Sequence, residues 1–419
     1  MARSHVPASD AVQRQGVRTL PRNVWVVTIT SFLTDVSSEM VLNLLPLFLA
    51  GSLGVKTNVI GLIEGVADTT ASLLKVVSGW LSDRLGSRKG LAVTGYAIST
   101  VSKPFLYLAS TWSGVLAVRF ADRIGKGIRT APRDALIAAT VDARQRGLAF
   151  GLHRAGDTAG AALGLAAALV VVWAAQGEQI DLARGTFQTI VLVSVIPAAL
   201  AVLILALGAH DVPVVEKRPP VRLTVRGIDA RYRLFLVIVA VFSLGNSADA
   251  FLILRANALG LSVVGVLGML ITFNVVYMLI SEPAGALSDR VGRWRLLAGG
   301  WLFYALVYLG FAAADAAWQV WMLYGLYGVY YGMTYGVSKA LVADLVPRPQ
   351  LGTAYGLYDA TVGLMALPAS LIAGILWQGV SRWDGLGPSA PFTFGAGMAL
   401  LAVALLPLVR RGSGADRSC

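Results

Sequence analysis

Long apolar stretches alternate with short polar ones along most of this 419-residue chain. Each stretch reaches the roughly 20 residues that a helix needs to cross about 30 Å of hydrocarbon. Because lipid offers no partners for backbone hydrogen bonds, such stretches form helices rather than open strands. The pattern predicts about twelve membrane-spanning helices, of which the fourth is the least apolar. They cover residues 23–50, 57–82, 89–110, 112–140, 145–175, 187–208, 232–257, 262–287, 294–314, 316–345, 351–378 and 391–409.

The composition agrees with a chain that is mostly shielded from water. Hydrophobic residues make up 56% of the chain and charged residues 14%, whereas soluble domains average about 25% charged residues. The one cysteine, Cys419, forms no disulfide within the chain. Residues 1–22 are polar and basic, which is unlike a secretory signal.

Arginine and lysine are concentrated in alternate loops. Basic loops of membrane proteins stay in the cytoplasm, so we expect a multi-pass protein of the inner (cytoplasmic) cell membrane with both termini cytoplasmic. The net charge of +12 reflects this asymmetry and contact with anionic lipid, not nucleic acid. The basic segments are 1–22, 83–89, 142–146, 210–233, 289–295 and 410–417, and the opposite loops hold little beyond Lys56, Arg184 and Arg382.

The two halves of the chain repeat each other. LSDRLG, which contains Asp83, returns as LSDRVG with Asp289, and RGLAFGL (146–152) corresponds to LGTAYGL (351–357). The longest polar segment, 208–233, separates the copies and is typical of a linker. Two halves of six helices then share one orientation, related by an axis along the membrane normal. The predicted division is an N-terminal arm at 1–22, bundles at 23–208 and 232–410, a cytoplasmic linker at 209–231 and a tail at 411–419.

Two six-helix halves, with G-x-L-S-D-R-x-G-x-x-[KR] after the second helix and an echo after the eighth, resemble the major facilitator superfamily. The resemblance covers about residues 23–410. It implies an all-α membrane protein of twelve helices in two pseudo-symmetric bundles, which rock around a central site.

The resemblance also implies a cytoplasmic latch in these loops, although the same charges can serve only the positive-inside asymmetry. Asp83 would lie against a neighbouring helix N-terminus, where the helix dipole favours an anion. Arg84, Arg88 and Lys89 would pair across the seam between the halves. The latch residues are Gly79, Asp83, Arg84, Gly86, Arg88, Lys89, Asp289 and Arg290.

Charged residues inside the spans are costly in lipid and therefore indicate function. Asp35 and Glu39 lie one turn apart on the first helix, with Asp35 about 18 Å along it at 1.5 Å per residue. Because burial favours the protonated form of a carboxylate, we predict that this pair couples transport to protons. The alternative is a permanently paired structural carboxylate.

The fourth helix carries a stripe of cations along one face. Arg119 matches the arginine motif R-x-x-x-G-x-G of the family, although Arg123 replaces the first glycine, and the resemblance implies a position near the coupling carboxylate. The central hypothesis pairs Arg119 or Arg123 with Asp35 or Glu39. Lys126 and Arg129 are assigned to the substrate cavity. The stripe consists of Arg119, Arg123, Lys126, Arg129 and Arg133.

Six further charged residues are secondary candidates: Glu64, Asp68 and Lys75 on the second helix, and His153, Arg154 and Asp157 on the fifth. The first three are expected to form a static ion network. His153 can relay protons or only hold a hydrogen bond. The fifth helix also keeps Gly151, Gly160 and Gly164 of a glycine motif that the resemblance associates with antiporters, which favours export.

The second half carries fewer charges. Asp249 in the seventh helix is assigned to the cavity. Along one face of the tenth helix stand Tyr324, Tyr327, Tyr331 and Tyr335. Tyrosine combines an apolar ring with a hydroxyl, so we predict that this face lines a cavity for organic cargo, unless the rings belong to the membrane interface.

These features predict a secondary active transporter that works by alternating access and exports a small organic molecule in exchange for protons. The alternative is a proton-coupled importer of an anionic nutrient or metabolite; a metal-cation exporter or a non-transporting membrane protein is a weaker interpretation. Catalytic arrangements, zinc-type spacing and a phosphate-binding loop are absent from the sequence, so we expect no enzyme, no cofactor and no bound metal. The expected partners are the substrate, protons and the bilayer, and the protein is expected to be a monomer.

Overall fold

The computed structural model describes residues 19–85, 87–142, 145–212, 229–347 and 350–411, which are almost entirely helical. The helices of the first half are α1 (Arg22–Leu42), α2 (Leu45–Leu47), η2 (Phe48–Ser52), α3 (Thr57–Leu85), α4 (Arg88–Ser102), α5 (Phe105–Leu108), α6 (Trp112–Thr140), α7 (Arg146–Gln176) and α8 (Arg184–Gly208). Those of the second half are α9 (Ala230–Gly245), α10 (Ala250–Ala258), α11 (Val263–Val291), α12 (Arg293–Ala313), α13 (Ala317–Leu345), α14 (Leu351–Gln378) and α15 (Ala390–Arg411). Joined across short breaks, these helices form twelve long segments in the described residues, which confirms the predicted all-α membrane fold.

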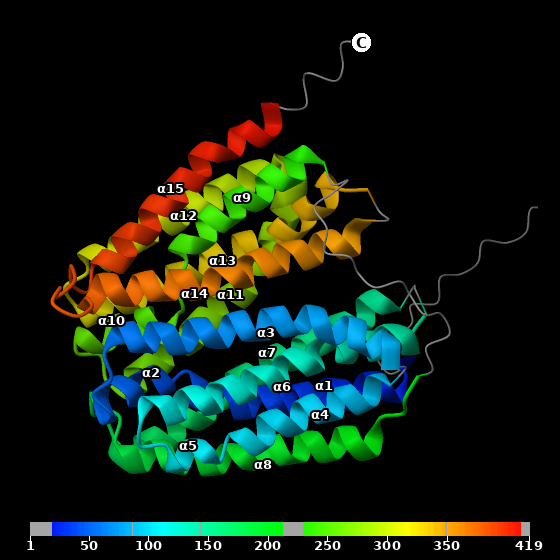
Figure 1. Cartoon of the computed structure of the whole chain (residues 1–419), viewed down its shortest axis with the longest axis horizontal. Helices are drawn as coiled ribbons and strands as arrows, with labels where there is room; N and C mark the ends of the chain where they lie inside the picture. Colours follow the sequence, from blue (N-terminus) through cyan, green and yellow to red (C-terminus); the bar gives the residue numbers. More distant parts are fainter. Residues whose placement is uncertain (1–18, 86, 143–144, 213–228, 348–349, 412–419) are drawn as a thin grey trace, which may run out of the picture.

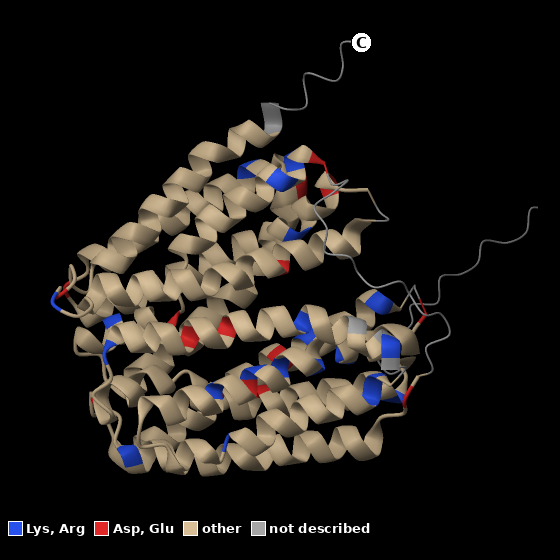
Figure 2. Cartoon of the chain, viewed as in Figure 1, with Lys and Arg blue, Asp and Glu red and all other residues tan. Residues whose placement is uncertain are grey.

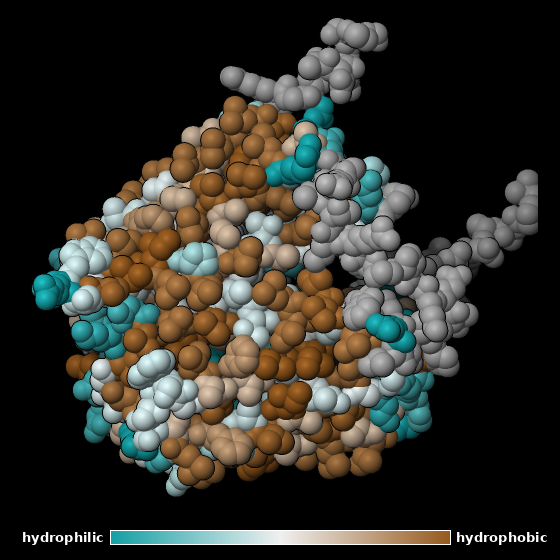
Figure 3. Space-filling view, in the orientation of Figure 1, coloured by the Kyte–Doolittle hydropathy of each residue, from teal (hydrophilic) through white to brown (hydrophobic). Residues whose placement is uncertain are grey.

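The outside of the molecule is apolar, as lipid requires. Figure 3 shows hydrophobic side chains over most of one face, and residues such as Leu163, Val170 and Leu207 are exposed. Within the described residues, eight segments are long and apolar enough to cross a membrane by length and composition alone. The α6 segment is not among these eight. Its hydropathy is low, as predicted, because it carries many of the charged residues that lie inside the protein.

Three spans are interrupted. The first passes from α1 to α2 and η2 after Leu42, and the third from α4 to α5 at Lys103 and Pro104. The seventh breaks between α9 and α10, where Asp249 is the N-cap of α10. Proline lacks a backbone donor and so interrupts the hydrogen-bond ladder of a helix. In transporters, discontinuous helices surround the binding site, and two of these breaks adjoin the site described below.

The helices of the two halves form two groups that meet along two seams (Figure 1). On one seam α3 packs along α14, and on the other α7 packs along α11. Where α3 begins, the Thr57 N–H donates to Gln378 (2.7 Å). On the second seam the Ser262 hydroxyl donates to Glu178 (2.7 Å). These contacts join the halves at the end opposite the start of α1 and the end of α15 (Figure 1).

Glycines bring the backbones of neighbouring helices close together. A Cβ at Gly61 of α3 would lie 2.2 Å from the carbonyl oxygen of Ser370 in α14. A Cβ at Gly160 of α7 would lie 2.4 Å from the carbonyl oxygen of Phe32 in α1. Such small-residue contacts are a common way to pack helices in membranes, and here they fix which helices face one another around the site.

Candidate functional site

Charged side chains lie midway along several helices, most of all α3 and α6 (Figure 2). They line three cavities that share wall residues. The inner chamber (about 200 Å³) is lined by Asp35, Glu64 and Arg119 among others. The central chamber (about 410 Å³) is lined by Lys75, Lys126 and Asp249 among others. The aromatic chamber (about 330 Å³) is lined by Phe242, Trp301 and Tyr330 among others.

The inner chamber contains more carboxylates than cations. Its acidic side chains are Asp35, Glu39, Glu64, Asp68, Asp122 and Asp249. Its basic side chains are Arg119, Arg123, Lys126 and Arg129. The predicted coupling residues are therefore brought together in one small space, in company with acids from α3 and from the break between α9 and α10.

The partners of the first two arginines differ from the central hypothesis. Arg119 forms an ion pair with Glu64, and both side chains are buried, with exposed fractions of 2% and 9%. Arg123 lies 3.9 Å from Asp68. Neither arginine forms an ion pair with Asp35 or Glu39 among the described residues. The reason is packing: a Cβ at Gly127 of α6 would lie 2.5 Å from Leu74 of α3, so the carboxylates of α3 are nearest to the stripe.

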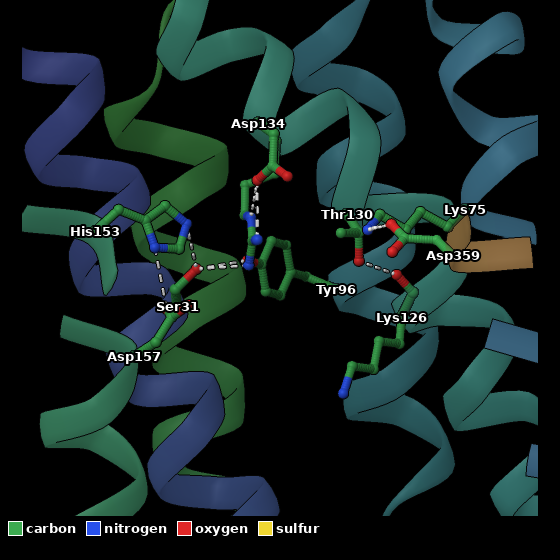
Figure 4. Close-up of polar contacts among 10 residues, drawn as sticks. Ser31, Lys75, Tyr96, Lys126, Thr130, Asp134, His153, Asp157 and Asp359 are labelled. Atoms are coloured by element: carbon green, nitrogen blue, oxygen red, sulfur yellow. Dashed lines mark hydrogen bonds and ion pairs between the residues drawn. The ribbon is translucent and has the colours of Figure 1, made fainter. Parts of the chain in front are cut away.

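Lys126 and Arg129, which the sequence assigned to the substrate cavity, both line the inner chamber, but the two side chains have different surroundings. Arg129 donates to Ser99 (2.9 Å) and its guanidinium carbon lies 4.5 Å from the ring centre of Tyr96. Lys126 is exposed although it lies mid-helix, and it forms no ion pair among the described side chains. In Figure 4 its side chain extends away from Thr130 and from the ion pair beside it. Lys126 is thus a free cation that faces the cavity.

Lys75 and Asp359 form an ion pair across the seam between α3 and α14 (3.1 Å), with exposed fractions of 40% and 31% (Figure 4). The sequence placed Lys75 in a network with Glu64 and Asp68, and this was wrong because α14 lies against the same face of α3. An exposed pair contributes about 0–1 kcal/mol. The Lys75–Asp359 pair is therefore weak, whereas the Arg119–Glu64 pair is shielded from water and lies within the first half.

A second polar cluster joins α1, α4, α6 and α7 (Figure 4). Ser31 lies at its centre, 3.0 Å from the Tyr96 hydroxyl and 3.4 Å from Nε2 of His153. Arg133 donates to Ser31 (3.3 Å), and Nδ1 of His153 lies 3.1 Å from Asp157. His153 is buried, so its ring is held from both sides. Arg154, by contrast, turns to the second half and donates to the Tyr277 hydroxyl (3.4 Å).

In the second half, Asp249 faces the first half from the break in the seventh span. The Tyr327 hydroxyl donates to Asp249 (3.0 Å). Tyr331 and Tyr335 line the aromatic chamber. Tyr324 and Tyr327 are almost fully buried instead and pack within a cluster of rings around Phe273 and Tyr304, because their side of α13 faces α11 and α12.

Sequence reasoning missed Lys103, Phe242, Trp301 and Tyr330. Lys103 is buried at the break between α4 and α5 and donates to Ser37 (2.5 Å) and Ser38 (3.1 Å) of α1. The lysine beside Pro104 was a visible signal of that break. The three aromatic residues lie in ordinary apolar runs, and nothing in the pattern separates them from lipid-facing rings.

The predicted latch is described only in part. Gly86 and the side chain of Asp83 lie outside the described residues. Gly79 lies close to α6, with its Cβ position 3.4 Å from Ala131. In the second copy Asp289 lies 3.6 Å from Arg293, which also pairs with Asp344, while Arg290 is exposed.

Asp211 caps the N-terminus of α4, the helix that follows this loop. Its carboxylate accepts the backbone N–H groups of Arg88 and Lys89 (both 3.1 Å) and the Ser87 hydroxyl (2.8 Å). Asp211 follows α8, so these backbone contacts of Arg88 and Lys89 lie within the first half, and the predicted pairs of their side chains across the seam stay a prediction. We call this contact the Asp211 cap.

Asp211→Ala is expected to destabilise the protein by about 0.5–2 kcal/mol, as loss of a helix cap does. Asp211→Asn should cost less, because an asparagine oxygen can accept the same donors. Thermal unfolding of the purified protein measures both. Asp384→Ala, in an exposed loop, is the matched control, and an equal effect of the two alanine variants would contradict the cap.

The site therefore holds two kinds of chemistry. Its carboxylates and imidazole can bind and release protons, and its free charges and aromatic walls can hold a small polar organic molecule. Among the described residues, no group of three or more His, Cys, Asp and Glu side chains is placed to hold a metal ion.

Comparisons with known proteins agree with the fold. The sequence profile of the Major Facilitator Superfamily matches residues 27–367 and 234–418. A relative from Methanocaldococcus jannaschii, described as an uncharacterized transporter of that superfamily, is 34% identical over 395 residues, 93% of this chain and 95% of the relative. An uncharacterized protein of Mycobacterium tuberculosis is 27% identical over 367 residues, 85% of this chain and 87% of the relative.

Solved structures show the same architecture at low identity. The crystal structure of a variant of the nucleoside transporter NupG superposes with a TM-score of 0.77 at 14% identity, over 92% of this chain and 99% of that one. A POT family transporter in complex with 5-aminolevulinic acid superposes with a TM-score of 0.76 at 12% identity, over 96% of this chain and all of that one (100%). At such identities the likeness shows the fold alone.

Proposed function

This chain belongs to the major facilitator superfamily, and from that premise we propose that it exports a small organic molecule in exchange for protons. As a member of the family it is a multi-pass membrane protein and a secondary transporter, not an enzyme. The proposal concerns the coupling ion, the direction and the residues that act.

The charge of the inner chamber supports proton coupling most directly. Six carboxylates and four cations line it, and one further cation, Lys103, is buried beside α1. Full ionisation therefore still leaves a surplus of negative charge. Enclosing unpaired charge away from water costs several kcal/mol unless the group is neutralised. When the halves close over this chamber, protons bound to the surplus carboxylates remove that cost.

Asp35 and Glu39 are the carboxylates best placed to take these protons. Glu64 and Asp68 are matched by Arg119 and Arg123. Among the described residues, the Glu39 carboxylate accepts only a neutral donor, the Asn43 amide (2.7 Å). Asp35 has no ion pair among the described residues. The carboxylates paired with arginine stabilise the fold, and the two carboxylates of α1 bind and release the coupled protons.

Export is supported by the packing of α7 on α1. Two glycines of the antiporter-associated motif, Gly160 and Gly164, lie at this contact. A Cβ at Gly164 would lie 2.5 Å from the Val36 carbonyl oxygen and 3.1 Å from Cβ of Glu39. The motif thereby holds the helix with the coupling acids against α7. The same proposal assigns residues 23–208 and 232–410 to the two moving bodies, with 209–231 between them, and places both termini of this monomer in the cytoplasm.

The test measures gradient-driven uptake into everted membrane vesicles. A cargo is first identified by comparing growth of overexpressing and deletion cells on toxic organic compounds, metals and siderophore-like compounds. An acid vesicle interior should then drive that cargo inward; an importer would instead move it outward.

Asp35→Asn and Glu39→Gln should each reduce uptake to the level seen without a gradient, because the neutral side chains cannot exchange a proton. Exchange of labelled for unlabelled cargo should persist, since it needs no net proton movement. Asp384→Asn is the matched control. Gradient-driven uptake by both α1 variants would overturn the coupling assignment.

A further inference from the structure

We propose that the cargo is zwitterionic: its anionic group binds Lys126 of the first half, its cationic group binds Asp249 of the second, and its apolar body lies in the aromatic chamber. This inference rests on the proposed transport function and names its substrate class.

The charges of the central chamber leave one free group on each wall. Its charged lining residues are Asp68, Lys75, Arg123, Lys126 and Asp249. Asp68 is matched by Arg123, and Lys75 pairs with Asp359. One ammonium group and one carboxylate then remain without an ion pair among the described residues.

The Lys126 ammonium group is available to bind a ligand. Among the described residues it has no hydrogen-bond or ion-pair partner, and the Thr130 hydroxyl beside it donates to the Lys126 backbone carbonyl instead (2.6 Å). The Lys126 side chain lines the inner and central chambers (Figure 4). Arg123 and Arg129 lie one turn away on either side of it on α6. Three cations on one surface favour an anionic group there, and Lys126 is the member whose donors are all available.

Asp249 offers the opposite charge from the opposite half. One of its oxygens, Oδ1, accepts the Tyr327 hydroxyl (3.0 Å), which orients the carboxylate. The other oxygen has no hydrogen-bond partner among the described residues, and the side chain lines both the inner and the central chamber. This oxygen is available to bind a cationic group of the cargo.

Because Lys126 and Asp249 lie on different halves, a ligand that binds both affects how close the halves lie. A ligand with one charge is held by one half, whereas a zwitterion bridges both and favours the arrangement in which they approach. A ligand shifts a conformational equilibrium only by its difference in affinity for the two states. A bridging cargo binds more tightly to the state in which the two halves are close, because only there does it contact both charges.

The aromatic chamber provides room for the body of the molecule. It shares Lys75, Asn246 and Tyr331 with the central chamber, so a ligand can extend from one into the other. Phe242 and Trp301 are stacked in its wall, with ring centres 4.5 Å apart. Such a wall suits an aromatic or other flat apolar group.

The experiment compares probes that share a phenyl group and differ in which charged groups they carry. The first set is L-phenylalanine, 3-phenylpropionate and phenethylamine. The second is the dipeptide Gly-Phe, its N-acetyl form and its amide, in which the charges are further apart. Apparent dissociation constants are taken from thermal stabilisation of the purified full-length protein in detergent at neutral pH.

In at least one set the zwitterion should bind about tenfold more tightly than either singly charged probe, a difference of about 1.4 kcal/mol. Lys126→Gln should make the zwitterion equal to the amine, and Asp249→Asn should make it equal to the carboxylate. Each variant keeps the response to the other charge, which shows that it is folded. Lys56→Gln and Asp384→Asn, both in exposed loops, should leave the order unchanged.

The proposal is overturned if neither set shows a zwitterion preference at millimolar concentrations, or if the preference survives in both chamber variants. These measurements involve no proton gradient, so their failure leaves the coupling proposal standing. Conversely, if Asp35→Asn and Glu39→Gln both retain gradient-driven uptake in vesicles, the coupling assignment fails and the probe preference is unaffected.

Discussion

Arg119→Leu is expected to lower the free energy of unfolding by about 3–5 kcal/mol, because it leaves Glu64 as an unpaired buried charge. This is the largest effect that we expect from a single substitution in the first half. Both side chains are almost inaccessible, so water cannot replace the missing guanidinium. Heat or denaturant unfolding of the purified protein in detergent measures the loss.

The double variant Arg119→Leu, Glu64→Leu should recover most of this stability. In the native pair, Nε and Nη1 of Arg119 and Oε1 of Glu64 are buried and have no hydrogen-bond partner in the part of the chain that the structure describes. The pair is therefore incompletely satisfied, and apolar residues of similar size often replace such pairs at no net cost. Recovered stability without recovered transport would separate the structural part of the pair from any part in transport.

The exposed ion pair of the seam is the control. Lys75→Leu should cost no more than about 1 kcal/mol, because Lys75 and Asp359 are partly solvated. If Arg119→Leu costs no more than Lys75→Leu, burial does not govern the strength of these pairs and our distinction between a shielded and a weak pair fails.

Gly61→Ala is expected to shift the protein at least about tenfold away from the arrangement described here. The added Cβ would lie 2.2 Å from the Ser370 carbonyl oxygen, closer than any side-chain carbon approaches. Relieving it forces α3 away from α14 where the halves are joined. Overpacking of this kind costs about 1–3 kcal/mol, and tenfold in population corresponds to about 1.4 kcal/mol.

Distances between spin labels at positions 56 and 384, in a Cys419→Ser background, measure this shift. The labels sit in loops next to α3 and α14, and their separation should increase. Gly151→Ala is the matched control, because no atom lies within 4 Å of its Cβ position. Alanine favours helix over glycine by about 1 kcal/mol, so it should be neutral or stabilising at position 151. An unchanged distance in Gly61→Ala would show that the seam yields locally.

The sequence predicted the spans well and the side-chain partners poorly, for one physical reason. Apolar runs and basic loops are local signals, and each residue contributes to them independently of the fold. The partner of Arg119 depends instead on which helix lies next to α6. That neighbour is set by contacts such as Gly127 against Leu74, which no single stretch of sequence displays.

The same reasoning explains the tyrosines of α13. Their spacing placed them on one face, but a face can point to a cavity or to another helix. Tyr324 and Tyr327 point into the ring cluster, and Tyr335, two turns on from Tyr327, reaches the chamber. Lys103 was missed because its partners are serine hydroxyls, which are too common in the chain to mark a site.

The Asp211 cap bears on how the protein responds to acid. Partial burial opposes ionisation of Asp211, but the Ser87 hydroxyl and the N–H groups of Lys89, Arg88 and Val212 outweigh it and hold the pKa below its usual range. A lowered pKa means that the stabilisation is complete above the ordinary value of about 3.9 and fades only as pH falls through the lower folded value. The joint between α8 and α4 is thus insensitive to mild acidification, so the proposed proton coupling depends on groups other than Asp211.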